Sequence, residues 1–135
     1  MTVIDWSENL SLKIKLIDEQ HKKLIDLIND FYDGINKSSS KEKIFEMINA
    51  MKNYAGFHFS TEENLLQRYN FPDYQNHRNT HDKFIVSVNN FEERFKSGKL
   101  LLSLEITNFI KEWITNHIMK TDKQYADFLI KNGVH

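Results

Sequence analysis

Histidine and carboxylate side chains recur in this sequence at spacings that suit metal binding. His58 is followed four residues later by Glu62, and His77 is followed four residues later by His81. Residues at this spacing lie about 40° apart around an α-helix, so they share a face. Imidazole and carboxylate together are the ligand set of borderline divalent metals such as iron, zinc and manganese. The two pairs therefore predict metal ligands on two helices.

Three further residues extend this set. His21 lies in an earlier helical pattern, and His117 and Asp122 lie near the C-terminal end. Leu24 follows His21 by three residues, and Ile114 precedes His117 by three, which puts these histidines on the apolar faces of their helices. We therefore expect all of the paired groups and these three residues to point into one core.

A metal site explains this pattern better than a set of structural histidines does. A single buried histidine is more often hydrogen-bonded within the core than bound to a metal. Burying five imidazoles and two carboxylates would cost about 1–3 kcal/mol for each group left unsatisfied. They are too many ligands for one ion. The pattern predicts a dinuclear site with the ligands His21, His58, Glu62, His77, His81, His117 and Asp122.

The spacing between His117 and Asp122 does not suit an ideal α-helix. Asp122 comes five residues after His117, which is about 140° around the helix. A π-bulge between the two would turn the carboxylate inward, and such bulges concentrate at functional sites. Alternatively, Asp122 reaches sideways to bridge both ions while His117 binds only one. In either case we expect Asp122 to be a ligand.

The ligand count indicates what such a site could do. Five imidazoles, two bridging carboxylates and a bridging oxide or hydroxide would leave one position open on a pair of six-coordinate ions. An open position on a metal is where a small exogenous ligand binds, either for carriage or for chemistry.

The composition is that of a globular domain and excludes several other classes. The 135 residues are 40% hydrophobic and 27% charged, and the formal net charge of -1 argues against a nucleic-acid binder. The absence of cysteine excludes disulfides and thiolate metal sites. The start of the chain has no signal-peptide pattern, and no stretch approaches the roughly 18 apolar residues of a membrane span. We expect a single cytoplasmic domain over residues 1–135, without a nucleic-acid or membrane partner.

The elements that must position the ligands are long helices, because the chain has only one proline and four glycines. Breaks at GINKSSS, NFPD and SG separate the segments with apolar residues at helical spacing, which cover about 17–35, 41–69, 73–96 and 101–131. Short connections favour antiparallel neighbours, so we expect an all-α, up-down-up-down antiparallel four-helix bundle. Residues 1–16 are expected to form a non-helical arm anchored by Trp6.

Four motifs in this sequence resemble the hemerythrin family, in particular its single-domain bacterial form. They are IDEQHKKL around His21, HFSTEENLL around His58 and Glu62, HRNTHDKF around His77 and His81, and WITNHIMKTDKQY around His117 and Asp122. The resemblance covers nearly the whole chain and matches all seven ligand positions. The five-residue step from His117 to Asp122 is also a trait of the family.

The resemblance implies a non-haem di-iron centre that binds O2 reversibly. It implies that His77, His81 and His117 hold the coordinatively full iron, and that His21 and His58 hold the iron with the open position. Glu62 and Asp122 would bridge the irons, together with an oxide or hydroxide. The residues nearest the bound O2 would be Leu24, Phe59, Trp113, Ile114 and Ile118, with Ile114 standing where the family often has leucine.

The function expected from these features is oxygen carriage, storage or delivery, not enzymatic turnover. We expect a monomer, with an oxygen-consuming protein as a candidate partner. Two alternatives stay open: a di-iron enzyme acting on peroxide, O2 or nitric oxide, and an oxygen or iron sensor acting in trans. Tyr125 is the one nearby candidate for a proton donor, because Glu63 lies about 140° from His58 and is expected to face away. The ligand types alone do not distinguish iron from manganese.

Overall fold

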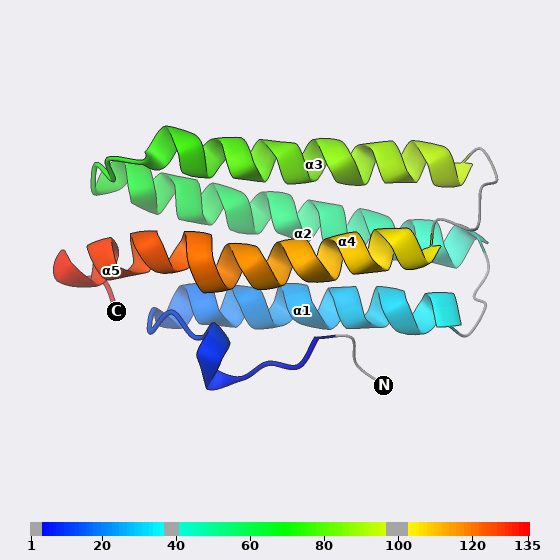
Figure 1. The fold of residues 1–135 in the computed structure, drawn as a ribbon, viewed down its shortest axis with the longest axis horizontal. Helices are drawn as coiled ribbons and strands as arrows, with labels where there is room; N and C mark the ends of the chain where they lie inside the picture. The colour runs from blue at the N-terminus through cyan, green and yellow to red at the C-terminus, as the bar shows by residue number, and fades with distance from the viewer. Residues whose placement is uncertain (1–3, 37–40, 97–102) are drawn as a thin grey trace.

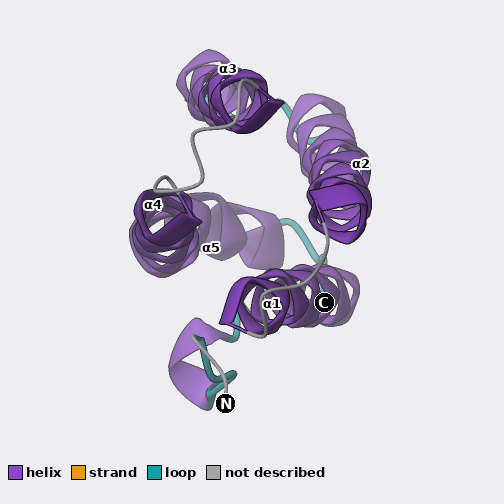
Figure 2. Ribbon diagram, turned by 90° about the vertical axis from the view of Figure 1, so that its right-hand side faces the viewer, coloured by secondary structure: helices purple, strands orange, loops and turns teal. Residues whose placement is uncertain are grey.

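The computed structural model describes residues 4–36, 41–96 and 103–135. Its long helices are α1 (Lys15–Asn36), α2 (Lys41–Arg68) and α3 (Tyr74–Lys96). A fourth rod consists of α4 (Ser103–Asn116), a π-helical segment η3 (His117–Asp122) and α5 (Lys123–Lys131). Figure 1 shows the four rods side by side, with alternating directions along the sequence. Figure 2 shows them around one centre, which confirms the predicted antiparallel four-helix bundle.

The helix ends agree closely with the sequence prediction where the structure describes them. Two of the three predicted breaks fall wholly or partly in residues 37–40 and 97–102, which lie outside the described residues. The break after α2 is described. Asn70 has φ 58°, and the amide hydrogen bonds from Asn70 to Gln67 O (3.1 Å) and from Phe71 to Leu66 O (2.9 Å) form a Schellman cap. Asparagine tolerates this left-handed conformation better than most residues do.

The N-terminal arm differs from its prediction in one respect. A short 3-10 helix, η1 (Glu8–Leu10), interrupts the expected non-helical segment, and α1 begins at Lys15 instead of about 17. The Asp18 carboxylate in the first turn of α1 accepts hydrogen bonds from Leu12 N (2.8 Å) and Ser11 Oγ (2.5 Å), which ties the arm to the start of the helix. Trp6 packs against the core as expected, and the Lys22 ammonium lies 5.0 Å from its ring centre.

Two apolar clusters fill the bundle, one on each side of a polar layer. The large cluster lies toward the 36–41 and 96–103 connections and includes Leu24, Ile28, Phe31, Phe59, Phe84, Val88, Ile114 and Ile118. The small cluster lies toward the other end and includes Ile14, Ile17, Leu66, Tyr125, Ala126 and Leu129. Along α1, for example, Ile17 belongs to the small cluster and Leu24 to the large one, with His21 between them.

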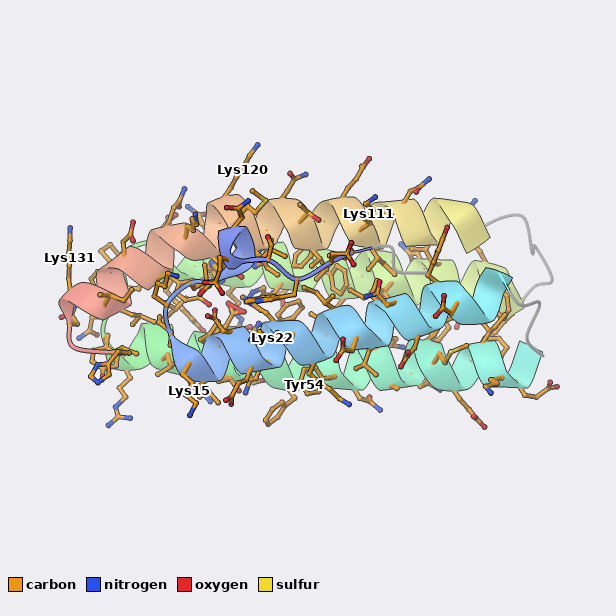
Figure 3. All side chains as sticks on the ribbon, turned by 90° about the horizontal axis from the view of Figure 1, so that it is seen from below. Lys15, Lys22, Tyr54, Lys111, Lys120 and Lys131 are labelled. Carbon is orange, nitrogen blue, oxygen red and sulfur yellow. The ribbon has the colours of Figure 1, made fainter. Side chains whose placement is uncertain are left out.

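Charged residues occupy the outer surface of the bundle. Lys120 and Lys131 project outward from the fourth rod in Figure 3. No helix among the described residues is long and apolar enough to cross a membrane.

Candidate metal centre

The seven predicted ligands meet in the polar layer between the two apolar clusters. They come from all four rods, and each side chain is at most 5% exposed. Their ligand atoms form two groups in which all atoms lie within 4.8 Å of one another. The larger group holds Glu62, His77, His81, His117 and Asp122, and the smaller group holds His21, His58 and Glu62.

Glu62 belongs to both groups because its two carboxylate oxygens face opposite ways. Oε1 contacts His58 Nε2 and lies 3.7 Å from His21 Nε2. Oε2 lies 3.3 Å from His77 Nε2 and 4.0 Å from His81 Nε2. A carboxylate in this position can bind one cation through each oxygen.

Asp122 is arranged in the same way on the opposite side of the layer. Its Oδ2 lies 3.3 Å from His21 Nε2, whereas its Oδ1 lies 3.2 Å from His77 Nε2 and 2.9 Å from His117 Nε2. Glu62 thus links imidazoles of α1 and α2 to those of α3, and Asp122 links the imidazole of α1 to those of α3 and η3.

The π-helix decides between the two alternatives for Asp122. Residues His117–Asp122 form the π-helix η3. Its wider turn accommodates one residue more than a turn of α-helix does. His117 and Asp122 are therefore both buried on the inner face, even though they are five residues apart. The bulge, and not a sideways reach from a regular helix, brings the carboxylate inward.

Buried polar atoms without a hydrogen-bond partner gather in this layer. Among the described residues they are His21 Nδ1, His58 Nε2, Glu62 Oε1, Asp122 Oδ1, Asp122 Oδ2 and Tyr125 Oη. Each would cost about 1–3 kcal/mol if nothing else satisfied it. The His81 and His117 Nε2 atoms lie 3.1 Å apart, close to the distance of about 3 Å between two nitrogen ligands at right angles on one ion. The residues therefore fit a pair of cations.

The pKa values of the imidazoles show where positive charge is favoured. Burial by itself lowers the pKa of His21, but the close contacts of its Nε2–H with the carboxylates of Asp122 and Glu62, and the negative charge of both, outweigh burial and raise that pKa to about 9. The same contributions raise the pKa of His77 to about 9. Burial dominates at His81 and lowers its pKa to about 3, which leaves a neutral imidazole that can bind a metal.

The two carboxylates stay ionised despite their burial. Burial raises the pKa of Glu62, but the charge of His58 and hydrogen bonds from nearby imidazoles bring it well below its usual range. Burial and the negative charge of Glu62 raise the pKa of Asp122, yet His117 and His21 lower it to a net value below the usual range. Positive charge in this layer is thus favoured, either as protons on imidazoles or as bound cations.

Two residues contact the ligands although the sequence did not predict such a contact for either. Gln20 Oε1 lies 2.7 Å from His58 Nδ1, and Glu63 Oε2 lies 3.0 Å from His81 Nδ1. The prediction that Glu63 faces away was wrong, because its carboxylate reaches His81 on α3. The signal in the sequence was their position directly beside a ligand, at Gln20-His21 and Glu62-Glu63.

Tyr125 lies fully buried beside the centre. Its ring meets that of His77 edge-on, with centroids 5.0 Å apart. Burial, followed by the negative charges of Glu62 and Asp122, raises its pKa well above the ordinary value. The phenol is therefore a neutral group next to the carboxylates of Glu62 and Asp122.

Aromatic rings cover the larger ligand group on the side of the large apolar cluster. Phe59 stacks on His81 with centroids 3.9 Å apart, and Trp113 stacks on His117 at 4.3 Å. Leu24, Ile114 and Ile118 are each at most 2% exposed and belong to the same cluster. The apolar residues predicted to surround a bound ligand thus lie on one side of the polar layer.

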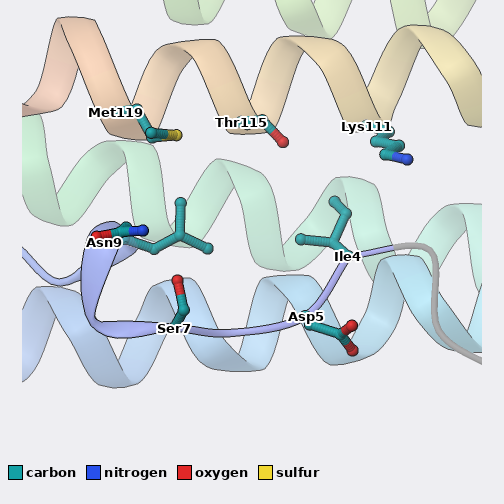
Figure 4. A pocket seen from close by; sticks show the side chains of 8 residues that line it. Ile4, Asp5, Ser7, Asn9, Lys111, Thr115 and Met119 are labelled. Carbon is teal, nitrogen blue, oxygen red and sulfur yellow. The ribbon is translucent and has the colours of Figure 1, made fainter.

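One surface cavity lies away from the site and another touches its edge. One cavity of about 250 Å³ lies between the N-terminal arm and the fourth rod, and its lining includes Asp5 and Ser7 of the arm and Lys111 and Thr115 of α4. Figure 4 shows these residues. This cavity contains none of the seven predicted ligands. Another cavity of about 230 Å³ reaches the site's edge, because Trp113 and His117 line it together with Lys120.

Comparisons with known proteins agree with this description. A family model for the hemerythrin HHE cation binding domain matches residues 12–129. The bacteriohemerythrin of Methylococcus capsulatus is 27% identical over 130 residues, covering 96% of this chain and 98% of its own. That of Clostridium acetobutylicum is 32% identical over 128 residues, covering 90% and 98%. A crystal structure of wild-type hemerythrin superposes with a TM-score of 0.85 at 26% identity, covering 93% of this chain and 96% of that one.

The fold and the site define a class of protein, namely four-helix bundles that bind metal through buried histidines and carboxylates. Within that class, the chain belongs to the hemerythrin family. Family membership and the clustered histidines and carboxylates together support O2 binding at a di-iron site.

Proposed function

We propose that this protein binds O2 reversibly at two iron ions held by the seven residues of the polar layer. His77, His81 and His117 hold one iron, and His21 and His58 hold the other. Glu62 and Asp122 would be ligands to both ions, and an oxide or hydroxide would complete the centre. The orientation of the two carboxylates supports this most directly. In each of them, one oxygen faces His21 of the smaller group and the other oxygen faces His77 of the larger group.

Two ferrous ions held by these residues would supply the electrons needed for reversible O2 binding. The protein's own residues fix the arrangement. Five Nε2 atoms point into the layer, so each imidazole offers its lone pair there and keeps its proton on Nδ1. The smaller group offers fewer imidazoles than the larger one, so the position for an external ligand lies beside His21 and His58.

The apolar residues beside the site make the binding reversible. Leu24, Phe59, Trp113, Ile114 and Ile118 contribute carbon atoms and no acid or base to that side of the layer. Excluding water and protons from the pocket protects bound O2 from release as peroxide. For this reason we infer carriage, storage or delivery of O2 instead of turnover, with a monomeric chain that supplies an oxygen-consuming partner.

An iron assay combined with an optical titration tests the proposal. The purified protein is reduced with dithionite, freed of reductant, exposed to oxygen and then purged with argon. We expect two irons per chain and a charge-transfer band that appears with oxygen and disappears on purging. Irreversible oxidation with turnover of peroxide or another substrate would instead identify a di-iron enzyme, and Tyr125 would then be the proton donor to test.

A further inference from the structure

Two of the proposed ligands have hydrogen-bond partners of different charge. The Nδ1 atom of His58 lies 2.7 Å from the amide oxygen of Gln20, and that of His81 lies 3.0 Å from a carboxylate oxygen of Glu63. His58 belongs to the smaller ligand group and His81 to the larger one. The two ligand groups thus differ not only in their ligands but also in the hydrogen-bond acceptors of those ligands, which are a neutral amide at His58 and a carboxylate at His81.

A chain of hydrogen bonds fixes the orientation of Gln20. The Thr61 hydroxyl donates to Phe57 O at 3.1 Å, so its oxygen is available to accept from Gln20 Nε2 at 3.5 Å. The amide oxygen of Gln20 must then face His58, where it accepts from Nδ1–H. His58 therefore has a neutral acceptor, and nothing in this chain of contacts carries a charge.

Glu63 gives His81 a charged acceptor. Its Oε2 faces His81 Nδ1, while its Oε1 lies 3.8 Å from Arg78 Nε, so a guanidinium supports the carboxylate from the solvent side. The Glu63 side chain is 21% exposed and Arg78 is 51% exposed, so the contact lies at the edge of the core. An anion that accepts the Nδ1 proton increases the basicity of the opposite ring nitrogen, and such partners typically change metal affinity 10–100-fold.

We propose that Glu63 and Gln20 are positioning residues that make the two metal ions electronically unequal. Glu63 makes His81 the stronger donor, so the larger group holds its ion more tightly and favours the more highly charged state. Gln20 orients His58 without that effect, so the ion of the smaller group returns more readily to the ferrous state when its ligand leaves. The choice of iron rests on the proposed function, whereas the inequality between the two groups rests on the two contacts.

A reciprocal pair of substitutions tests this. Glu63→Gln keeps an acceptor of the same shape but removes the charge, and Gln20→Glu adds a charge behind His58. Glu93→Gln is the matched control, because it removes the same charge from a 72% exposed side chain far along α3. Cobalt(II) affinity of the metal-free protein and the midpoint potentials of the iron-loaded protein are measured for each variant.

We expect Glu63→Gln to weaken the tighter cobalt site about tenfold or more. If the preference of the iron site for ferric over ferrous iron falls by the same factor, the midpoint potential of that site rises by about 59 mV for each tenfold change. Gln20→Glu should strengthen the weaker cobalt site and lower the other potential, and Glu93→Gln should change neither. These shifts need a charge, so a residue that only holds the ring in place would not produce them.

Unchanged affinity and potentials in Glu63→Gln, or the same weakening in both reciprocal variants, would overturn the inference. The cobalt measurements do not involve O2. A wild-type protein that binds two unequal cobalt ions but does not bind O2 reversibly would therefore contradict the proposed function and leave this inference standing. If Glu63→Gln does not fold, Gln20→Glu alone still decides, because only a charge effect strengthens its site.

Discussion

The metal-free protein should lose stability as the pH rises from 6.5 to 9. His21 and His77 have folded-state pKa values of about 9 against an ordinary value of 6.5. Between these values the folded chain carries protons that the unfolded chain has released, so the free energy of unfolding falls with increasing pH. The stabilisation is complete below pH 6.5 and is lost as the pH passes 9.

The size of this loss follows from the shift. A displacement from 6.5 to about 9 corresponds to about 3 kcal/mol for each histidine at 1.36 kcal/mol per unit. The two share the carboxylates Glu62 and Asp122, so their contributions are not independent, and a total of about 3–6 kcal/mol is expected. His81 acts in the opposite direction, because its folded pKa of about 3 makes acid destabilising below pH 6.5. The metal-free protein should therefore be most stable near pH 6.5.

Urea denaturation of metal-free protein at intervals from pH 5 to 10 measures this dependence. A His77→Gln variant, in which one of the two protons is removed, should show a shallower decline. Protein loaded with metal should show no decline over this range, because cations replace the protons. A metal-free protein whose stability stays constant or increases between pH 6.5 and 9 would refute the assignment of protons to these imidazoles.

Three further results are expected. Metal loading at pH 7.5 should release about two protons per chain, from His21 and His77, and fewer at pH 10; an indicator dye measures the release, and no release at pH 7.5 would contradict the charge assignment. Asp122→Asn should keep the helical content but reduce bound iron below two per chain, since an amide does not bridge two cations; full iron content would exclude Asp122 as a bridge. Phe59→Ala should lower the free energy of unfolding by about 3–5 kcal/mol and speed oxidation of the reduced protein, because water gains access to His81; wild-type oxidation kinetics would show that the ring does not exclude water.

Much of the centre could be predicted from the sequence because its ligands lie on helices with regular apolar faces. Two residues four apart on a helix share a face wherever the helix packs, so the pairs at His58 and His77 needed no tertiary information. The step from His117 to Asp122 was different. Its spacing showed that a regular α-helix would not place both residues on one face. The sequence did not distinguish a π-bulge from a sideways reach of Asp122, because both are compatible with that spacing.

Gln20 and Glu63 could not be assigned because their roles depend on the neighbouring helix. Each lies about 100° around the helix from the ligand beside it, so periodicity places it at the margin of the core. Whether such a side chain meets a histidine or solvent depends on how α1 and α3 pack against α2. The short helix η1 was missed for a similar reason, since three residues carry no periodic signal.

The position of the polar layer between two apolar clusters has a consequence for cooperativity. Among the described residues, the hydrophobic interior is divided, because charged and polar groups separate the small cluster from the large one. Without metal, the two ends are joined mainly through the helices themselves and through shared protons. Bound cations would link all four rods at the midpoint and make both ends unfold together. Amide exchange in α5, which packs only in the small cluster, would then report events at the centre and beyond it.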